Sequence, residues 1–119
     1  MIQSQTKLKL GDNSGVRVAR CFHIYKNRIG LIGFLILVSV RATKPQNKIK
    51  KGTVHKAIII RTSYKTQRQN GFSVFFNENA IVLVNKKEEL LTTRIFGPIG
   101  GELRRKNLLK ILSLGSVIV

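Results

Sequence analysis

The apolar segment Ile29 to Val40 limits the folds open to this chain more than any other feature of its sequence. It reads IGLIGFLILVSV and lies between Arg28 and Arg41, so twelve residues in a row carry no charge. A membrane-spanning helix needs about 20 such residues, so the run is too short to cross a bilayer. Because Val, Ile and Phe favour strands and the two glycines permit a bend, we predict a buried, bent strand over 30–40.

Further strand patterns, separated by turn-forming residues, occupy the chain as far as about residue 85. The continuous run Ala57 to Ile60 predicts a strand that is buried on both faces, and Asn70-Gly71 is a strong hairpin signal. Short strands with turn-rich connections favour a small closed barrel, because closure removes exposed sheet edges. Besides 30–40, strand patterns lie over 6–10, 16–25, 54–62, 72–76 and 80–85, which makes six candidate ranges for a barrel of five strands. Phe22 and most other phenylalanines are expected in the core.

The character of the sequence changes after residue 85. Leu103, Leu108, Ile111 and Leu112 recur at helical spacing, and we expect an extended tail from Ser113 onward. We therefore predict an all-β fold with minor α: a five-stranded β-barrel over about 1–85, then a loop and one or two short helices over about 86–119. At 119 residues, the chain is expected to form a single domain, 1–119.

The charge of the chain indicates a polyanionic partner. Its 22 Lys and Arg against 5 Asp and Glu give a formal net charge of +17. No helix-turn-helix or zinc-finger pattern is present, and Trp is absent, which favours folded RNA over DNA or a free single strand. Loops at one rim of a barrel can converge on one phosphate-binding surface. The candidate RNA-binding residues are Asn13, Ser14, Lys44, Lys48, Lys50, Lys51, Arg61, Lys65, Arg68, Arg104 and Arg105.

The sequence offers no constellation of residues for catalysis. Its few acids are dispersed, and His23 and His55 have no Cys or carboxylate at metal-ligand spacing. The single cysteine, Cys21, lies in a strand pattern and is predicted to be a small core residue. We therefore expect no enzyme activity, no metal and no cofactor.

Several motifs, in order along nearly the whole chain, carry a resemblance to a known family. The central one runs from Ala57 through Asn70-Gly71, Phe76 and Asn79 to Val82-Leu83. Together these motifs closely resemble the universal large-subunit ribosomal protein fourteen family. The others are Gln5-Thr6, Asp12 to Gly15, Lys50 to Gly52, Thr93 to Pro98, Glu102 to Arg104 and Lys110 to Leu114.

The resemblance implies a five-stranded barrel with a small helical C-terminal element. It implies a structural constituent of the large ribosomal subunit that binds large-subunit rRNA. It also implies contact with small-subunit rRNA across an intersubunit bridge and with neighbouring large-subunit proteins. In bacterial and organellar members a ribosome silencing factor docks on the C-terminal surface, which by motif matching would include Thr93, Arg94, Lys110 and Ser113 here.

Departures from the family pattern bear on the source of the chain. Gly33-Phe34, Thr53 and the tail 115–119 stand where the family usually carries acids. The chain also has 14 Ile, 13 Lys and 8 Asn but 4 Ala, a bias that AT-rich coding produces. These features favour a mitochondrial ribosome, with a bacterial or plastid ribosome as the alternative. Two rival functions remain open: a free RNA-binding or chaperone module outside the ribosome, and a small nuclease.

Overall fold

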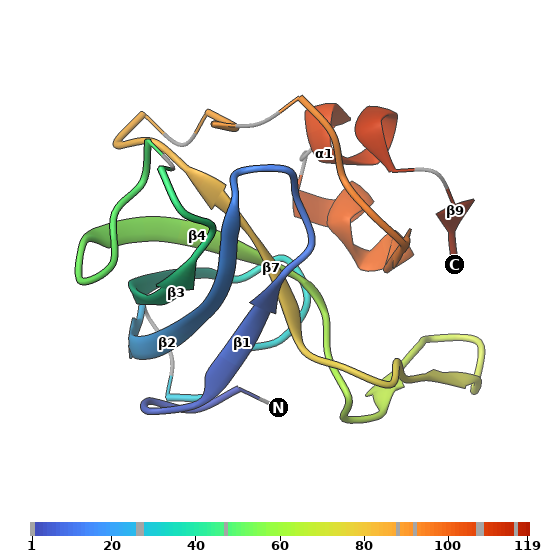
Figure 1. Ribbon diagram of the computed structural model, residues 1–119. Helices are drawn as coiled ribbons and strands as arrows, with labels where there is room; N and C mark the ends of the chain where they lie inside the picture. Colours follow the sequence, from blue (N-terminus) through green and yellow to red (C-terminus); the bar gives the residue numbers. More distant parts are fainter. Residues whose placement is uncertain are drawn as a thin grey trace.

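Five strands close into a barrel, as the sequence predicts (Figure 1). The computed structural model describes residues 2–25, 28–46, 48–87, 89–91, 93–106, 109–115 and 117–119. The barrel order is β1-β2-β3-β4-β7, in which β1 and β7 pair in parallel and all other neighbours are antiparallel. The strands are β1 (Lys7–Leu10), β2 (Val16–Ile24), β3 (Leu35–Thr43), β4 (Val54–Arg61) and β7 (Ala80–Val84).

The unbroken run Ala57 to Ile60 is buried on both faces, which confirms the prediction for β4. Successive side chains of a strand point to opposite sides, so Ala57 and Ile59 pack in the barrel interior while Ile58 and Ile60 pack on the outside. The exterior pair belongs to a second apolar cluster, which includes Ile99, Leu103 and Ile111 from the C-terminal part of the chain. The C-terminal element therefore covers one outer face of the barrel.

The prediction of a single strand over 30–40 is wrong in its first half, because β3 begins only at Leu35. Gly30 forms an isolated bridge with Ile2, and a turn follows in which Phe34 N donates to Leu31 O at 3.1 Å. Gly33 has a φ of 90°, a conformation that residues with a Cβ rarely adopt. The turn places part of the apolar run at the surface, where Leu31 is exposed.

A short hairpin projects from the barrel between β4 and β7 (Figure 1). Its strands are β5 (Thr66–Gln67) and β6 (Ser73–Val74), and the turn uses Asn70-Gly71 as predicted, with a φ of 87° at Gly71. The prediction that 72–76 is a barrel strand is wrong. β6 pairs only with β5 in its two-stranded sheet, while the parallel pairing of β1 with β7 closes the barrel without it.

The C-terminal part contains one 3-10 helix and one short α-helix, in line with the one or two short helices that the sequence predicts. They are the 3-10 helix η1 (Gly101–Lys106) and helix α1 (Leu109–Leu114), flanked by the parallel pair β8 (Pro98–Ile99) and β9 (Val117–Ile118). The predicted tail begins later than expected, since Ser113 lies within α1. No helix among the residues described is long and apolar enough to cross a membrane.

The prediction that most phenylalanines lie in the core is wrong. Phe22 is exposed because the register of β2 shifts against β3 between Cys21 and His23, which turns two successive side chains outward. Phe72, Phe75 and Phe96 are exposed as well. Cys21 itself is fully buried, as expected, and burial raises the pKa of its thiol.

Candidate nucleic-acid interface

The loop between β3 and β4 presents four lysines to solvent. Lys44, Lys48, Lys50 and Lys51 are all exposed, and none takes part in the ion pairs found among the described residues. Backbone geometry shapes the loop: Thr53 Oγ1 donates to Lys50 O at 2.7 Å, and Gly52 turns the chain with a φ of 89°. Because turn hydrogen bonds rather than ion pairs hold this loop, its ammonium groups remain available to a polyanion.

Arg61, which the sequence places among the RNA-binding candidates, is instead an internal residue. Its side chain is 7% exposed. Nη1 donates to the carbonyl oxygens of Phe96 and Pro98, both at 2.8 Å, and Nη2 donates to Glu78 Oε1 at 3.1 Å. The other carboxylate oxygen of Glu78 lies 3.3 Å from Lys9 Nζ. The guanidinium thus ties β4 to two distant segments, and Arg61 is not part of the exposed basic surface.

The segment that Arg61 holds makes a second close approach at Gly97. A Cβ on Gly97 would lie 2.7 Å from Arg61 Nη1, and its φ of 79° is one that favours glycine. Phe96 N also donates to Gly11 O at 2.6 Å. The chain from Phe96 to Pro98 is therefore locked against the end of the barrel by a buried cation and by backbone contacts.

The remaining basic candidates lie on the side of the hairpin and of the C-terminal helices. Lys65 and Arg104 are exposed. Arg68 is partly buried: its Nε donates to Glu102 Oε1 at 2.7 Å, and Nη2 donates to Val119 O. The acid thereby neutralises Arg68, while the side chain of Arg105 lies outside the described residues.

The basic candidates do not converge on one rim, contrary to what the sequence allowed. Figure 1 shows the loop between β3 and β4 at one end of the molecule, with the β5–β6 hairpin and the C-terminal helices at the other. The longest principal-axis extent of the molecule is 45 Å. The basic candidates therefore divide into a loop cluster, Lys44, Lys48, Lys50 and Lys51, and a C-terminal cluster, Lys65, Arg68 and Arg104.

The turn between β1 and β2 brings together residues that the sequence assigned to different roles. Asp12 is buried, and its carboxylate accepts hydrogen bonds from Ser14 N, Ser14 Oγ and, at 3.0 Å, Leu83 N. Exposed Asn13, a candidate RNA ligand, donates through Nδ2 to Thr93 Oγ1 at 3.4 Å. The RNA candidates of this turn are therefore continuous with the candidate protein-partner surface.

The candidate protein-partner residues are all exposed. Besides Thr93, these are Arg94, Lys110 and Ser113. The guanidinium of Arg94 lies 5.4 Å from the centroid of the Phe96 ring, a cation–π arrangement that holds it at the surface. Ser113 Oγ donates to Lys110 O at 2.7 Å within α1.

Most acids of the described chain are occupied within the protein. Asp12 caps a turn, Glu78 pairs with Arg61 and Lys9, and Glu102 pairs with Arg68. The exposed Glu89 is joined to Asn85 by hydrogen bonds. Among the described residues, no group of three or more His, Cys, Asp or Glu could hold a metal ion. The surface field is therefore almost wholly positive.

One class of surface residue was missed by sequence reasoning, namely exposed aromatics on the hairpin and beside it. Tyr64, Phe72 and Phe75 are more than half exposed. The sequence did carry a signal, because adjacent Phe75 and Phe76 cannot both face inward from an extended chain.

In comparison with known families, the family model described as ribosomal protein L14p/L23e matches residues 1–119, the whole chain.

Proposed function

The chain belongs to the ribosomal protein L14p/L23e family, a family of structural, non-enzymatic components of the large ribosomal subunit, and on that basis we propose that it binds large-subunit rRNA. The loop cluster, Lys44, Lys48, Lys50 and Lys51, is the main contact in this proposal. The single observation that carries it is the exposure of all four lysines without an acid partner among the described ion pairs. Each phosphate contact releases condensed counterions, which supplies affinity and makes it salt-dependent.

A second surface in this proposal serves the interface between the subunits. Thr93, Arg94, Lys110 and Ser113 would form a protein-partner surface on which a ribosome silencing factor docks and blocks subunit joining. Their exposure and the anchoring of Phe96 to Pro98 by Arg61 support this role, because a docking surface needs a fixed backbone. Asn13, which bonds Thr93, would join this surface.

The proposed location is the mitochondrial ribosome, supported by the bias toward Ile, Lys and Asn. Lysate and purified mitochondria of the source organism are fractionated on sucrose gradients, with and without magnesium. We expect the protein to sediment with mitochondrial monosomes and to move to the free large subunit when magnesium is removed. A peak at the top of the gradient would support a free RNA-binding module, and sedimentation with another ribosome would correct the location.

The rRNA contact is tested on the same particles by ultraviolet crosslinking. Purified large subunits are irradiated and digested with nuclease and protease, and peptides that carry a nucleotide adduct are sequenced. We expect adducts from the loop cluster at 44–51 and none at Arg61. Adducts confined to other surfaces would refute the loop cluster as the main contact.

A further inference from the structure

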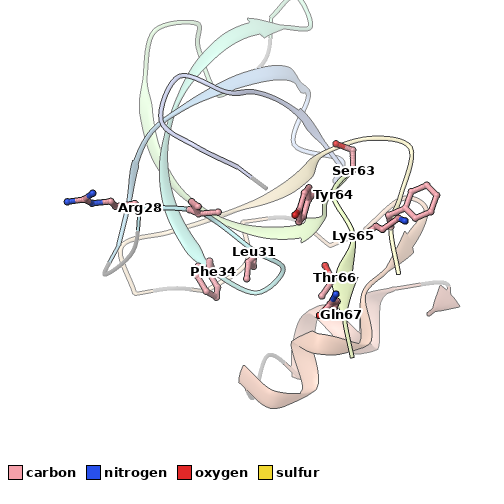
Figure 2. A pocket seen from close by; sticks show the side chains of 10 residues that line it. Arg28, Leu31, Phe34, Ser63, Tyr64, Lys65, Thr66 and Gln67 are labelled. Atoms are coloured by element: carbon pink, nitrogen blue, oxygen red, sulfur yellow. The ribbon is translucent and has the colours of Figure 1, made fainter. Parts of the chain in front are cut away.

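A groove on the described surface lies between two segments that are distant in the sequence (Figure 2). Leu31 and Phe34, from the turn before β3, line one wall, and Tyr64 to Gln67, at the start of the hairpin, line the other. The groove is open to solvent and has a volume of about 1110 Å³. It lies apart from the loop cluster, which contributes no residue to its lining.

The lining exposes apolar side chains that the barrel does not need. Tyr64 is 52% exposed and Phe75 is 58% exposed, and Ile29 and Leu31 add aliphatic surface. These four belong to neither of the two buried clusters of the protein. An apolar concavity of this size on a strongly cationic surface marks an interaction site rather than a part of the core.

The charge of the groove selects the kind of partner. Among the described residues that line it, Arg28 and Lys65 are the charged ones, both are exposed, and none is an acid. Thr66 also lines it, and its buried hydroxyl has no hydrogen-bond partner among the residues that the structure describes. A matching ligand therefore offers apolar groups flanked by carboxylates.

The aliphatic part of the lining favours a protein over RNA. Aromatic rings can stack on bases, but Ile29 and Leu31 offer no flat face for stacking. An RNA strand would also carry a phosphate at every nucleotide, and the described part of the lining supplies cations only at Arg28 and Lys65. Exposed Tyr and Arg beside apolar pockets are, by contrast, typical centres of protein–protein interfaces.

We propose that this groove receives a segment of a neighbouring large-subunit protein in which apolar side chains are flanked by Asp or Glu. The inference rests on the proposed function, because it assumes that the chain sits in the large subunit. Tyr64 and Phe75 are the apolar anchors, and Lys65 and Arg28 pair with the carboxylates. Binding there buries an apolar surface that would otherwise stay in water.

A zero-length carbodiimide crosslinker, which joins an amine directly to a carboxylate, tests the charge complementarity without a mutation. Purified large subunits are treated, and crosslinked peptides are sequenced by mass spectrometry. We expect Lys65 to be joined to an Asp or Glu of another protein, with two or more apolar residues within about four positions of that acid. Exposed Lys51, in the proposed rRNA contact, serves as the control and should give no protein crosslink. The proposal would be overturned if Lys65 formed no crosslink to a carboxylate of another protein. It would also be overturned if ultraviolet irradiation gave nucleotide adducts on Tyr64 or Phe75.

Substitution of the anchors tests the apolar contact. In large subunits that contain the double variant Tyr64→Ser/Phe75→Ser, the amount of the neighbouring protein that crosslinks to Lys65 should fall at least five-fold. The amount of the variant chain itself should stay at its normal level. Phe72→Ser is the matched control, because Phe72 is the most exposed aromatic of the hairpin and does not line the groove. Full retention of the neighbour in the double variant would refute the proposal, whereas absence of the unmodified chain from the large subunit would refute the proposed function.

Discussion

Arg61 and the loop cluster are both basic in the sequence, yet the fold uses them in opposite ways. Arg61 is buried with hydrogen bonds to two carbonyl oxygens and one carboxylate. Lys50 and Lys51 are exposed, and no described ion pair includes them. Whether a cation is available to a ligand therefore depends on whether the fold brings acceptors to it. A cation that already satisfies internal acceptors is not free to bind phosphate, and its removal would leave those buried acceptors unpaired.

The largest effect on stability is expected from Arg61→Met, which keeps an apolar stem but leaves three acceptors without their donor. We expect a loss of roughly 3 kcal/mol in the free energy of unfolding, measured by urea denaturation. Arg61→Lys, which keeps the charge but not the planar fork, should lose less. Unchanged stability together with a weaker salt dependence of RNA binding would place Arg61 among the phosphate ligands after all.

A smaller loss in the free energy of unfolding is expected from Gly97→Ala, which places a methyl group against the Arg61 guanidinium. The new methyl group would need a left-handed backbone and would lie 2.7 Å from Arg61 Nη1, so we expect a loss of about 1–3 kcal/mol. Gly52→Ala is the matched control, since Gly52 has a similar φ of 89°, but apart from its two chain neighbours no described residue has an atom within 4 Å of its Cβ position. Equal losses at the two glycines would show that the contact with Arg61 contributes nothing.

The double variant Lys50→Gln/Lys51→Gln should weaken RNA binding and leave the stability of the fold nearly unchanged, which is the reverse of the effect expected for Arg61. We expect the free energy of unfolding to change by less than about 0.5 kcal/mol, because neither side chain is used by the fold. The slope of log K against log salt for binding to large-subunit rRNA should become shallower by roughly 1.5. Filter binding over a range of salt concentrations measures this slope. Lys86→Gln/Lys87→Gln, also at exposed positions, is the control and should change the slope less.

The smallest expected effect concerns Cys21, whose reactivity reports opening of the barrel. Burial raises the pKa of its thiol, so at a given pH the folded protein holds less thiolate and reacts slowly with alkylating reagents. The same shift means that the folded state loses some stability as the pH rises above about 8.5, the ordinary thiol pKa. Alkylation, followed by mass spectrometry, should be faster in Arg61→Met and unchanged in Lys50→Gln/Lys51→Gln. Equal alkylation rates of Cys21 in the two variants would contradict the prediction that Arg61 stabilises the barrel and that Lys50 and Lys51 do not.

Much of the barrel could be predicted because its signals are local. The alternation of β1, the unbroken apolar run of β4 and the Asn70-Gly71 turn each depend on neighbouring residues. The loop that carries the loop cluster could be predicted for the same reason, because Pro45 and Gly52 mark a loop between two strands. The start of β3 was harder to predict, since an apolar run does not reveal where a turn at Gly33 interrupts it.

The sequence by itself determined the class of fold, the excess of positive charge and the scarcity of acids, because these follow from composition and short-range patterns. Only the tertiary structure decided which cations are free. The acceptors of Arg61 lie 17, 35 and 37 residues away in the chain, a separation that no local pattern encodes. The tertiary structure also decided that Tyr64 and Phe75 share a groove with Leu31, because folding alone brings the turn before β3 beside the hairpin. Charge is a property of the residue, but its use depends on contacts made across the whole fold.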